Sequence, residues 1–341
     1  MMRVDWNNLS RIGAAAAATV LAPNVAEAHV KWFAHYSVPQ QPLPLHQVFN
    51  ATFWQLNITA AIVVLLIGYL GQQSIGITIT GSLDRLGAGL KPRIEALYRG
   101  GGACFFTALW VLGGIIMTPE LKTNWSFISW LQLAMAVGMF WRRTLPLSAL
   151  GIAFLYAYGV YAYGIFHMLD YPIFLGVAAY LALTGLELDF FGMRPLDVAR
   201  WTAALTLMWA AMEKWAYPDW TYPVLASHPE ITMDLNPHFY MIAAGTLEFG
   251  LAFALLCSPL VRRLGALVLT LMFTSAVLDF GKIDAIGHSM IIVILLGILV
   301  DEKPEARRPP FIAPIVYCGA LAAYVAAYWG LHAVIYGTTI W

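Results

Sequence analysis

The residues that could do chemistry in this chain are ionisable side chains inside or beside long apolar stretches. Glu213 and Lys214 are adjacent in one such stretch, and Glu248 lies in the middle of another. An ionisable group at membrane depth costs about 2.5–3.5 kcal/mol or more, so each one needs a partner or a function. Burial disfavours the charged form of a carboxyl group and a nearby lysine favours it. Proton-coupled chemistry uses such opposed pressures, and we therefore expect these three residues to exchange protons.

A second group of polar residues crowds a short turn between two later apolar stretches. Its members are Asp279, Lys282, Asp284 and His288. Neighbouring helices should bring this group and Glu248 to one outward-facing pocket. A structural alternative is an ion-paired set, in which Glu248 or Asp279 pairs with Lys214 or Lys282 and only holds helices together.

Aromatic side chains gather at the same predicted rim: Trp209, Trp215, Tyr217, Trp220, Tyr222 and Phe280. Tryptophan and tyrosine are enriched at membrane–water interfaces, so an interfacial belt is one interpretation. The other is a stacking wall for a quinone head group, which needs flat apolar faces and a few hydrogen-bonding groups. The second interpretation assigns a cofactor-binding role to Trp209, Trp215, Tyr217, Asp279, Lys282, Asp284 and His288.

A separate hypothesis concerns the sequence HVKWFAHY at residues 29–36. Cleavage after Ala28 would give His29 both an α-amine and an imidazole, with His35 nearby. Nitrogen ligands of this kind suit Cu(II), which makes these two histidines candidate metal ligands. The alternative is an ordinary N-terminal segment that lies on the membrane surface.

The composition limits the class of protein that can carry these groups. Of 341 residues, 60% are apolar and 11% are charged, and the mean hydropathy is +0.70. Soluble domains carry roughly 25% charged residues, so a soluble enzyme, a disordered chain and a nucleic-acid binder are excluded. The three cysteines lie in apolar runs without a CxxC pair, which argues against a disulfide framework or a zinc ribbon.

Apolar stretches long enough to span a bilayer recur along the chain, and they predict an all-α polytopic bundle of about ten transmembrane helices. The predicted spans are 54–71, 101–118, 125–141, 146–165, 172–188, 200–217, 239–258, 264–280, 286–300 and 312–336. With residue 29 outside, thirteen of the nineteen Lys and Arg residues fall in cytoplasmic loops and four fall outside. This bias predicts a bacterial inner-membrane protein with both termini on the periplasmic side.

The chain divides into segments by composition. Residues 1–28 have a basic start, an apolar run and an Ala-Glu-Ala site, which predict a cleaved signal peptide. The other segments are a periplasmic stretch (29–53), a first helix with a basic cytoplasmic loop (54–99), a four-helix block (100–190), a second four-helix block (200–301) and a final helix (311–341).

The two four-helix blocks have features in common. Trp110 precedes Pro119 by nine residues, as Trp209 precedes Pro218, and each block has a turn with paired arginines. Each block also has an outer turn with an acid and a histidine, FHMLDYP (166–172) and FGKIDAIGH (280–288). These features favour a parallel duplication, although two ordinary helical hairpins could converge on them. Under duplication, the first block would be scaffold and the second would carry the site.

Four runs of the second block resemble the DoxX-like family of four-helix membrane proteins. They are WAAMEKWAYPDWTYPVL (209–225), GTLEFGLAFALL (245–256), VRRLGALVLTLMF (261–273) and FGKIDAIGHSMIIVILL (280–296). The resemblance implies that Glu213, Lys214, Glu248 and His288 line the bundle. The family includes the small subunit of a thiosulfate:quinone oxidoreductase and is related to MauE proteins. The chain lacks the paired cysteines of MauE-like redox partners.

These observations lead to a first hypothesis and two alternatives. The first is a quinone-interacting redox subunit or accessory in the lipid bilayer, which works with a membrane or periplasmic redox partner protein. The second is a transporter or binding protein for copper or a small acid. The third is a non-catalytic membrane assembly factor. Whether the protein is an enzyme stays open at this point.

Overall fold

The computed structural model describes residues 30–232, 234–302 and 309–341. Across these residues the fold is all-α, with two isolated β-bridges and no strand. The predicted signal peptide and the candidate copper ligand His29 lie outside the described residues, as do Lys303, Arg307 and Arg308, three of the basic residues predicted to be cytoplasmic. The all-α prediction is confirmed.

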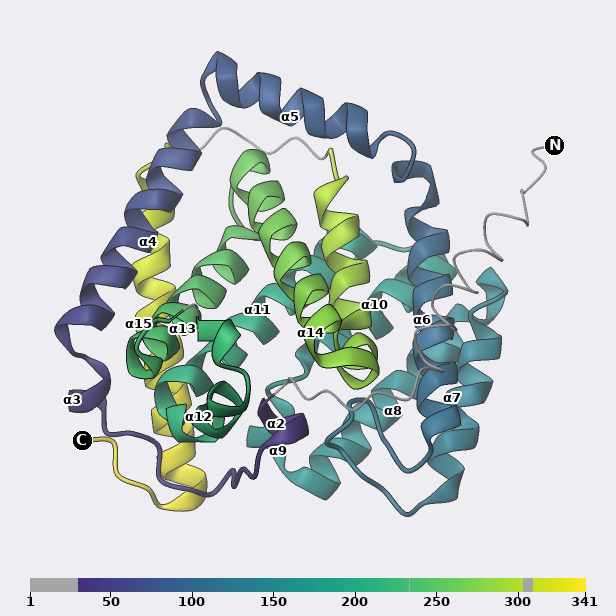
Figure 1. Ribbon diagram of the computed structural model, residues 1–341. Coiled ribbons are helices and arrows are strands. Elements are labelled where there is room, and N and C mark those ends of the chain that lie inside the picture. Colours follow the sequence, from purple (N-terminus) through teal and green to yellow (C-terminus); the bar gives the residue numbers. More distant parts are fainter. Residues whose placement is uncertain (1–29, 233, 303–308) are drawn as a thin grey trace.

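The helices follow one another with short connections (Figure 1). They are α2 (Val30–Phe33), α3 (Leu45–Val48), α4 (Ala51–Leu70), α5 (Ser74–Gly87), α6 (Ile94–Leu112), α7 (Ser126–Gly138), α8 (Leu145–Tyr163), α9 (Ile165–Met168), α10 (Pro172–Leu186), α11 (Pro195–Ala216), α12 (Pro218–Ser227), α13 (Pro237–Ala254), α14 (Pro259–Leu299) and α15 (Ile312–Tyr336).

Local sequence explains where several helices begin. Proline is the first residue of α10, α11, α12, α13 and α14, where its missing N–H costs nothing. Asn50 caps α4 by accepting a hydrogen bond from the backbone N–H of Phe53 at 3.0 Å. Asn236 caps α13 in the same way.

Helix α14 turns back on itself at Gly281. This glycine has φ 77° and ψ −151°, a conformation that residues with a Cβ rarely adopt. The two arms run side by side in Figure 1, and Nε of Arg263 on the first arm donates to the Asp301 carbonyl just after the second at 3.1 Å. The predicted reversal between spans 264–280 and 286–300 is therefore confirmed.

Four of the helical segments among the described residues are long and apolar enough to cross a membrane: Ala51–Leu70, Arg142–Tyr163, Pro259–Leu299 and Ile312–Tyr336. Two shorter apolar helices, Ser126–Gly138 and Pro172–Leu186, accompany them. Helices also lie over the other predicted spans, in α6, α11 and α13. The finding supports a multi-pass membrane protein.

The loops gather at two opposite ends of the bundle. One end contains α2, α3, α9, α12 and the C-terminal residues, and α5 lies across the other end (Figure 1). We call the first of these the cavity end, because the cavity described below opens there. We call the other end the arginine end because Arg99, Arg142, Arg194 and Arg263 form ion pairs there. The loops predicted to be cytoplasmic are thus together, apart from those predicted to be outside.

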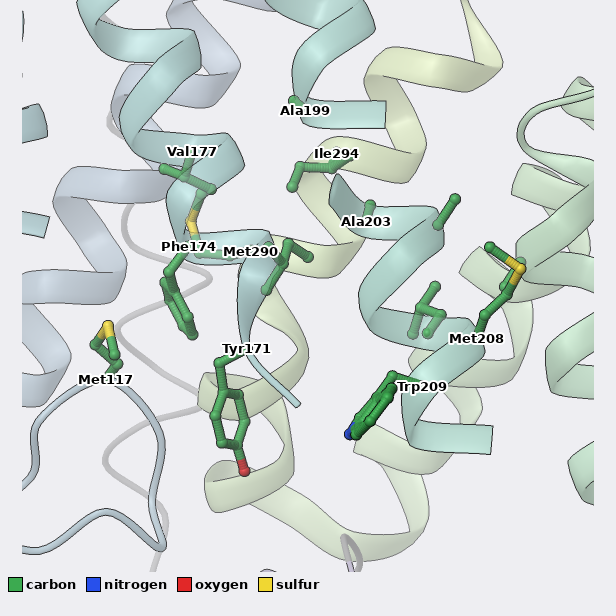
Figure 2. Close-up of a cluster of buried hydrophobic side chains, with 14 of the residues drawn as sticks. Met117, Tyr171, Phe174, Val177, Ala199, Ala203, Met208, Trp209, Met290 and Ile294 are labelled. Atoms are coloured by element: carbon green, nitrogen blue, oxygen red, sulfur yellow. The ribbon is translucent and has the colours of Figure 1, made fainter. Parts of the chain in front are cut away.

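The two four-helix blocks meet along α10 and α11, with the second arm of α14 beside them. Figure 2 shows Phe174 and Val177 of α10, Ala199 and Ala203 of α11, and Met290 and Ile294 of α14 in one buried cluster. Small residues permit this close approach, because Gly176 of α10 directly faces the Thr202 side chain of α11. This packing fixes α11, which carries Glu213 and Lys214, against the first block.

Candidate functional site

A cavity of about 580 Å³ opens at the cavity end, between α2, α10–α13 and both arms of α14. Its polar lining residues include Asp170, Glu213, Lys214, Glu248, Asp279 and His288. Its aromatic lining residues include Trp32, Tyr171, Tyr217, Trp220, Tyr240 and Phe280. Both four-helix blocks and the N-terminal segment therefore contribute to one cavity, which does not fit a purely scaffolding first block.

Glu248 and Lys214 form an ion pair on one wall of the cavity. Glu248 comes from α13 and Lys214 from the last turn of α11, and their side chains are 11% and 30% exposed. Glu248 is therefore a compensated charge rather than an isolated one. This is the ion pair that the structural alternative anticipated.

Glu213 does not share the partner of Lys214, the residue that follows it in the sequence. Lys31 of α2 forms ion pairs with both Glu213 and Asp170, and its side chain is only 3% exposed. Lys31 is one of the four basic residues predicted to lie outside, together with Lys122, Lys214 and Lys282, and it was not among the predicted site residues. The sequence did contain one indication that Lys31 is buried. Trp32 and Phe33 follow it directly, and apolar neighbours favour burial.

The electrostatics of this contact follow from its carboxyl groups. Burial alone would lower the pKa of Lys31, but Asp170 and Glu213 beside it raise that pKa well above its usual range. Burial raises the pKa of Asp170, and the attraction of Lys31 opposes the rise only in part. Lys31 thus stays charged while the carboxyl groups around it compete for protons.

Further acidic and basic groups stand next to Lys31. His167 Nε2 lies 3.1 Å from Glu120 Oε1, and both side chains are buried. Tyr36 connects them to Lys31, because its ring packs edge-on against His167 at 5.7 Å and lies under the Lys31 ammonium at 5.7 Å. We call Lys31, Glu120, His167, Asp170 and Glu213 the buried cluster.

His288 is held by Asp284 on the second arm of α14. The His288 Nδ1 lies 2.8 Å from Asp284 Oδ2, one helical turn away, and Asp284 is fully buried. Trp32 and Phe273 flank the imidazole at 5.2 Å and 4.6 Å between ring centroids. A carboxylate on Nδ1 fixes the tautomer and the orientation of the ring, which suits a proton donor or acceptor.

Tyr171 contributes a hydroxyl group that was not among the predicted site residues. The residue is 8% exposed and lines the cavity, and its hydroxyl has no hydrogen-bond partner among the described residues. Its oxygen lies at the tip of the ring in Figure 2, pointing away from the apolar cluster. A buried hydroxyl without a partner costs about 1–3 kcal/mol, which a ligand acceptor would recover.

The predicted aromatic wall is present only in part. Tyr217 and Trp220 line the cavity and stack on each other with centroids 4.0 Å apart. Trp215 instead donates to the Ile242 carbonyl at 3.2 Å, and Trp209 packs on Tyr328 at 4.9 Å. Neither is among the residues that line the cavity, so their predicted stacking role finds no support in the geometry.

The tip of the α14 hairpin also differs from expectation. Asp279 is exposed where it lines the cavity. Lys282 is not a lining residue, and neither side chain forms an ion pair with any part of the chain that the structure describes. The alternative in which Asp279 or Lys282 pins helices together therefore does not apply here.

The N-terminal segment is fastened to the bundle rather than lying beside it. The backbone N–H of Leu43 donates to the Ala216 carbonyl at 2.8 Å, and that of Leu45 donates to the Ile340 carbonyl at 3.0 Å. His35 is exposed, and no group of three or more potential metal-ligating side chains occurs within 30–232, 234–302 and 309–341. The described geometry gives the copper hypothesis no support.

Comparisons with known proteins do not extend these observations. The chain matches no protein-family model, no curated protein and no solved structure. The DoxX-like resemblance therefore stays a prediction that rests on its four sequence runs.

Proposed function

We propose that this protein is a multi-pass inner-membrane protein of the DoxX-like type that binds a quinone ring in the cavity, as a redox subunit or accessory. The observation that carries the proposal is Tyr171, a residue that lines an aromatic cavity of about 580 Å³ and whose buried hydroxyl has no partner among the described residues. Cavities of roughly 300–1,000 Å³ with a few fixed polar groups are typical of small-molecule sites.

The residues around Tyr171 fit such a ring. Trp220 and Phe280 are aromatic residues of the lining, and the Tyr171 hydroxyl is a donor of the kind that a ring carbonyl oxygen accepts from. A bound quinone would supply the electron-accepting chemistry. His288, oriented by Asp284, would hold or move a proton at a ring oxygen, and the Lys214–Glu248 pair would place two opposite charges on the cavity wall.

The first test is whether the purified protein carries such a ring. Protein isolated from membranes and exchanged into lipid discs should release a quinone on solvent extraction, detected by chromatography and mass spectrometry. Replacing His288 with Asn should lower the recovered quinone, and Glu248→Gln should alter membrane electron transfer. His35→Asn serves as the matched control, since His35 is exposed and does not line the cavity. An empty wild-type protein, with electron transfer unchanged by Glu248→Gln, would refute the proposal.

The proposed topology has ten crossings with the arginine end in the cytoplasm. Its support is the gathering of the basic loops at one end, together with the positive-inside rule. A cysteine introduced at Thr339, at the cavity end, should react with a membrane-impermeant maleimide in intact spheroplasts. One at Ser82, in α5, should react only after lysis. The opposite labelling pattern would invert the topology.

The Lys214–Glu248 ion pair also fits a non-catalytic assembly role, because a partly buried pair can simply hold α11 against α13. In that case Lys214→Met should lower the melting temperature without changing quinone content or electron transfer. A change in either readout at unchanged stability would exclude this role.

A further inference from the structure

The buried cluster holds more acidic groups than one lysine can compensate. Glu120, Asp170 and Glu213 surround Lys31, and all four side chains are at most 14% exposed. One oxygen each of Glu120 and Asp170 is buried without a hydrogen-bond partner among the described residues. Burial raises the pKa of Asp170, because the neutral acid loses far less hydration on burial than the carboxylate does.

The cluster reaches the cavity on one side. Asp170 and Glu213 line the cavity, whereas Lys31 and Glu120 are not lining residues and lie behind them. Asp170 and Tyr171 are consecutive residues, and both line the cavity. A ligand in the cavity would therefore contact one side of the cluster directly.

The other side of the cluster reaches the surface of the cavity end. The Tyr163 ring packs edge-on against His167 at 5.5 Å, and its hydroxyl donates to the Lys122 carbonyl at 2.7 Å in an exposed contact. Imidazole and carboxyl groups in contact are the side chains best able to pass a proton near neutral pH. The titratable or charged groups that face the cluster are Tyr36, Tyr156, Tyr163, Lys214, Tyr217, Tyr328 and Tyr336.

We infer that Lys31, Glu120, His167, Asp170 and Glu213 form a proton-exchange cluster that carries protons between the cavity and the surface of the cavity end. Lys31 is a positioning residue that keeps Asp170 and Glu213 together. Asp170 and Glu213 exchange protons with the cavity, and the His167–Glu120 pair exchanges them with solvent. The role of the cluster in serving a bound ring rests on the proposed function, whereas its proton occupancy does not.

Infrared spectroscopy of the full chain in lipid tests the cluster by itself. Near neutral pH the spectrum should contain a carbonyl band of a protonated, buried carboxyl group, which shifts in D₂O. Asp170→Asn or Glu213→Gln should abolish or displace that band. Asp219→Asn, which changes an exposed carboxyl group on α12, should leave it intact. A spectrum without the band, or a band unaffected by both cluster variants, would overturn the inference.

Calorimetry with decylubiquinone as the probe separates the two proposals. In buffers of different ionisation enthalpy, wild-type binding should show a buffer-dependent heat, because the cluster gains or loses a proton when the cavity fills. Glu120→Gln, which removes a carboxyl group of the cluster that does not line the cavity, should bind the probe with that dependence lost. Equal proton transfer in both proteins would refute the exchange role and leave the quinone site standing. No binding by the wild type, with the infrared band present, would refute the proposed function alone.

Discussion

Replacement of Lys31 with Met should destabilise the folded protein by about 3–5 kcal/mol, because it leaves the carboxyl groups of Asp170 and Glu213 buried together without a cation. The raised pKa of Lys31 sets the pH range of this effect. A basic group whose folded pKa is raised stabilises the fold below its unfolded pKa of about 10.4 and loses this contribution as the pH rises through the folded value. The gap between wild type and variant should therefore persist across neutral and moderately alkaline pH in thermal unfolding experiments in detergent.

A matched lysine and a compensated variant complete this experiment. Lys282→Met should change stability by little, because Lys282 forms no ion pair with the described residues. Combining Lys31→Met with Asp170→Asn and Glu213→Gln removes the buried charges as well as their partner, and should recover much of the loss. A fully stable Lys31→Met protein would mean that the cluster is open to water.

Replacement of Tyr171 with Phe should weaken quinone binding about 5- to 30-fold, the equivalent of roughly 1–2 kcal/mol for one lost hydrogen bond. The same change should leave the melting temperature unchanged or raise it, because the hydroxyl it removes is buried without a partner among the described residues. Titration of the lipid-disc protein with decylubiquinone, beside a thermal melt, measures both quantities.

Tyr156 offers the matched control for this variant. Its hydroxyl donates to the Met168 carbonyl at 2.8 Å, and Tyr156 is not among the residues that line the cavity. Tyr156→Phe should therefore lower stability by about 0.5–1.5 kcal/mol and leave binding unchanged. Equal binding by wild type and Tyr171→Phe would remove the main support for a ligand at this hydroxyl.

Much of the fold could be predicted from the sequence, because apolar length and charge placement are local properties. The hairpin in α14 is an example: FGKIDAIGH places two glycines and three polar residues between two apolar runs, and the chain reverses at Gly281. The gathering of basic loops at one end also followed from the alternation of the spans. The side on which each loop lies can be predicted by counting the crossings that precede it, and this needs no knowledge of side-chain contacts.

The site was harder to predict because its contacts join distant parts of the chain. Lys31 meets Asp170 and Glu213 across more than a hundred residues, and no spacing in the sequence encodes this contact. Adjacent Glu213 and Lys214 looked like one unit, but successive residues of a helix point about 100° apart and reach different partners. Trp209 and Trp215 lie near them in sequence, but their side chains point in other directions and pack elsewhere in the bundle.

The separation of charges between the two ends has an electrical consequence. Each ion pair found among the described residues joins groups at the same end, such as Lys31 with Asp170 or Arg194 with Asp301. In the proposed orientation, a proton that enters and leaves the cluster from the cavity end never travels through the transmembrane field. Because each elementary charge crossing 100 mV exchanges about 2.3 kcal/mol with that field, proton turnover at this site should be insensitive to membrane potential. The cell could then drive or stall it by periplasmic acidity, but not by voltage.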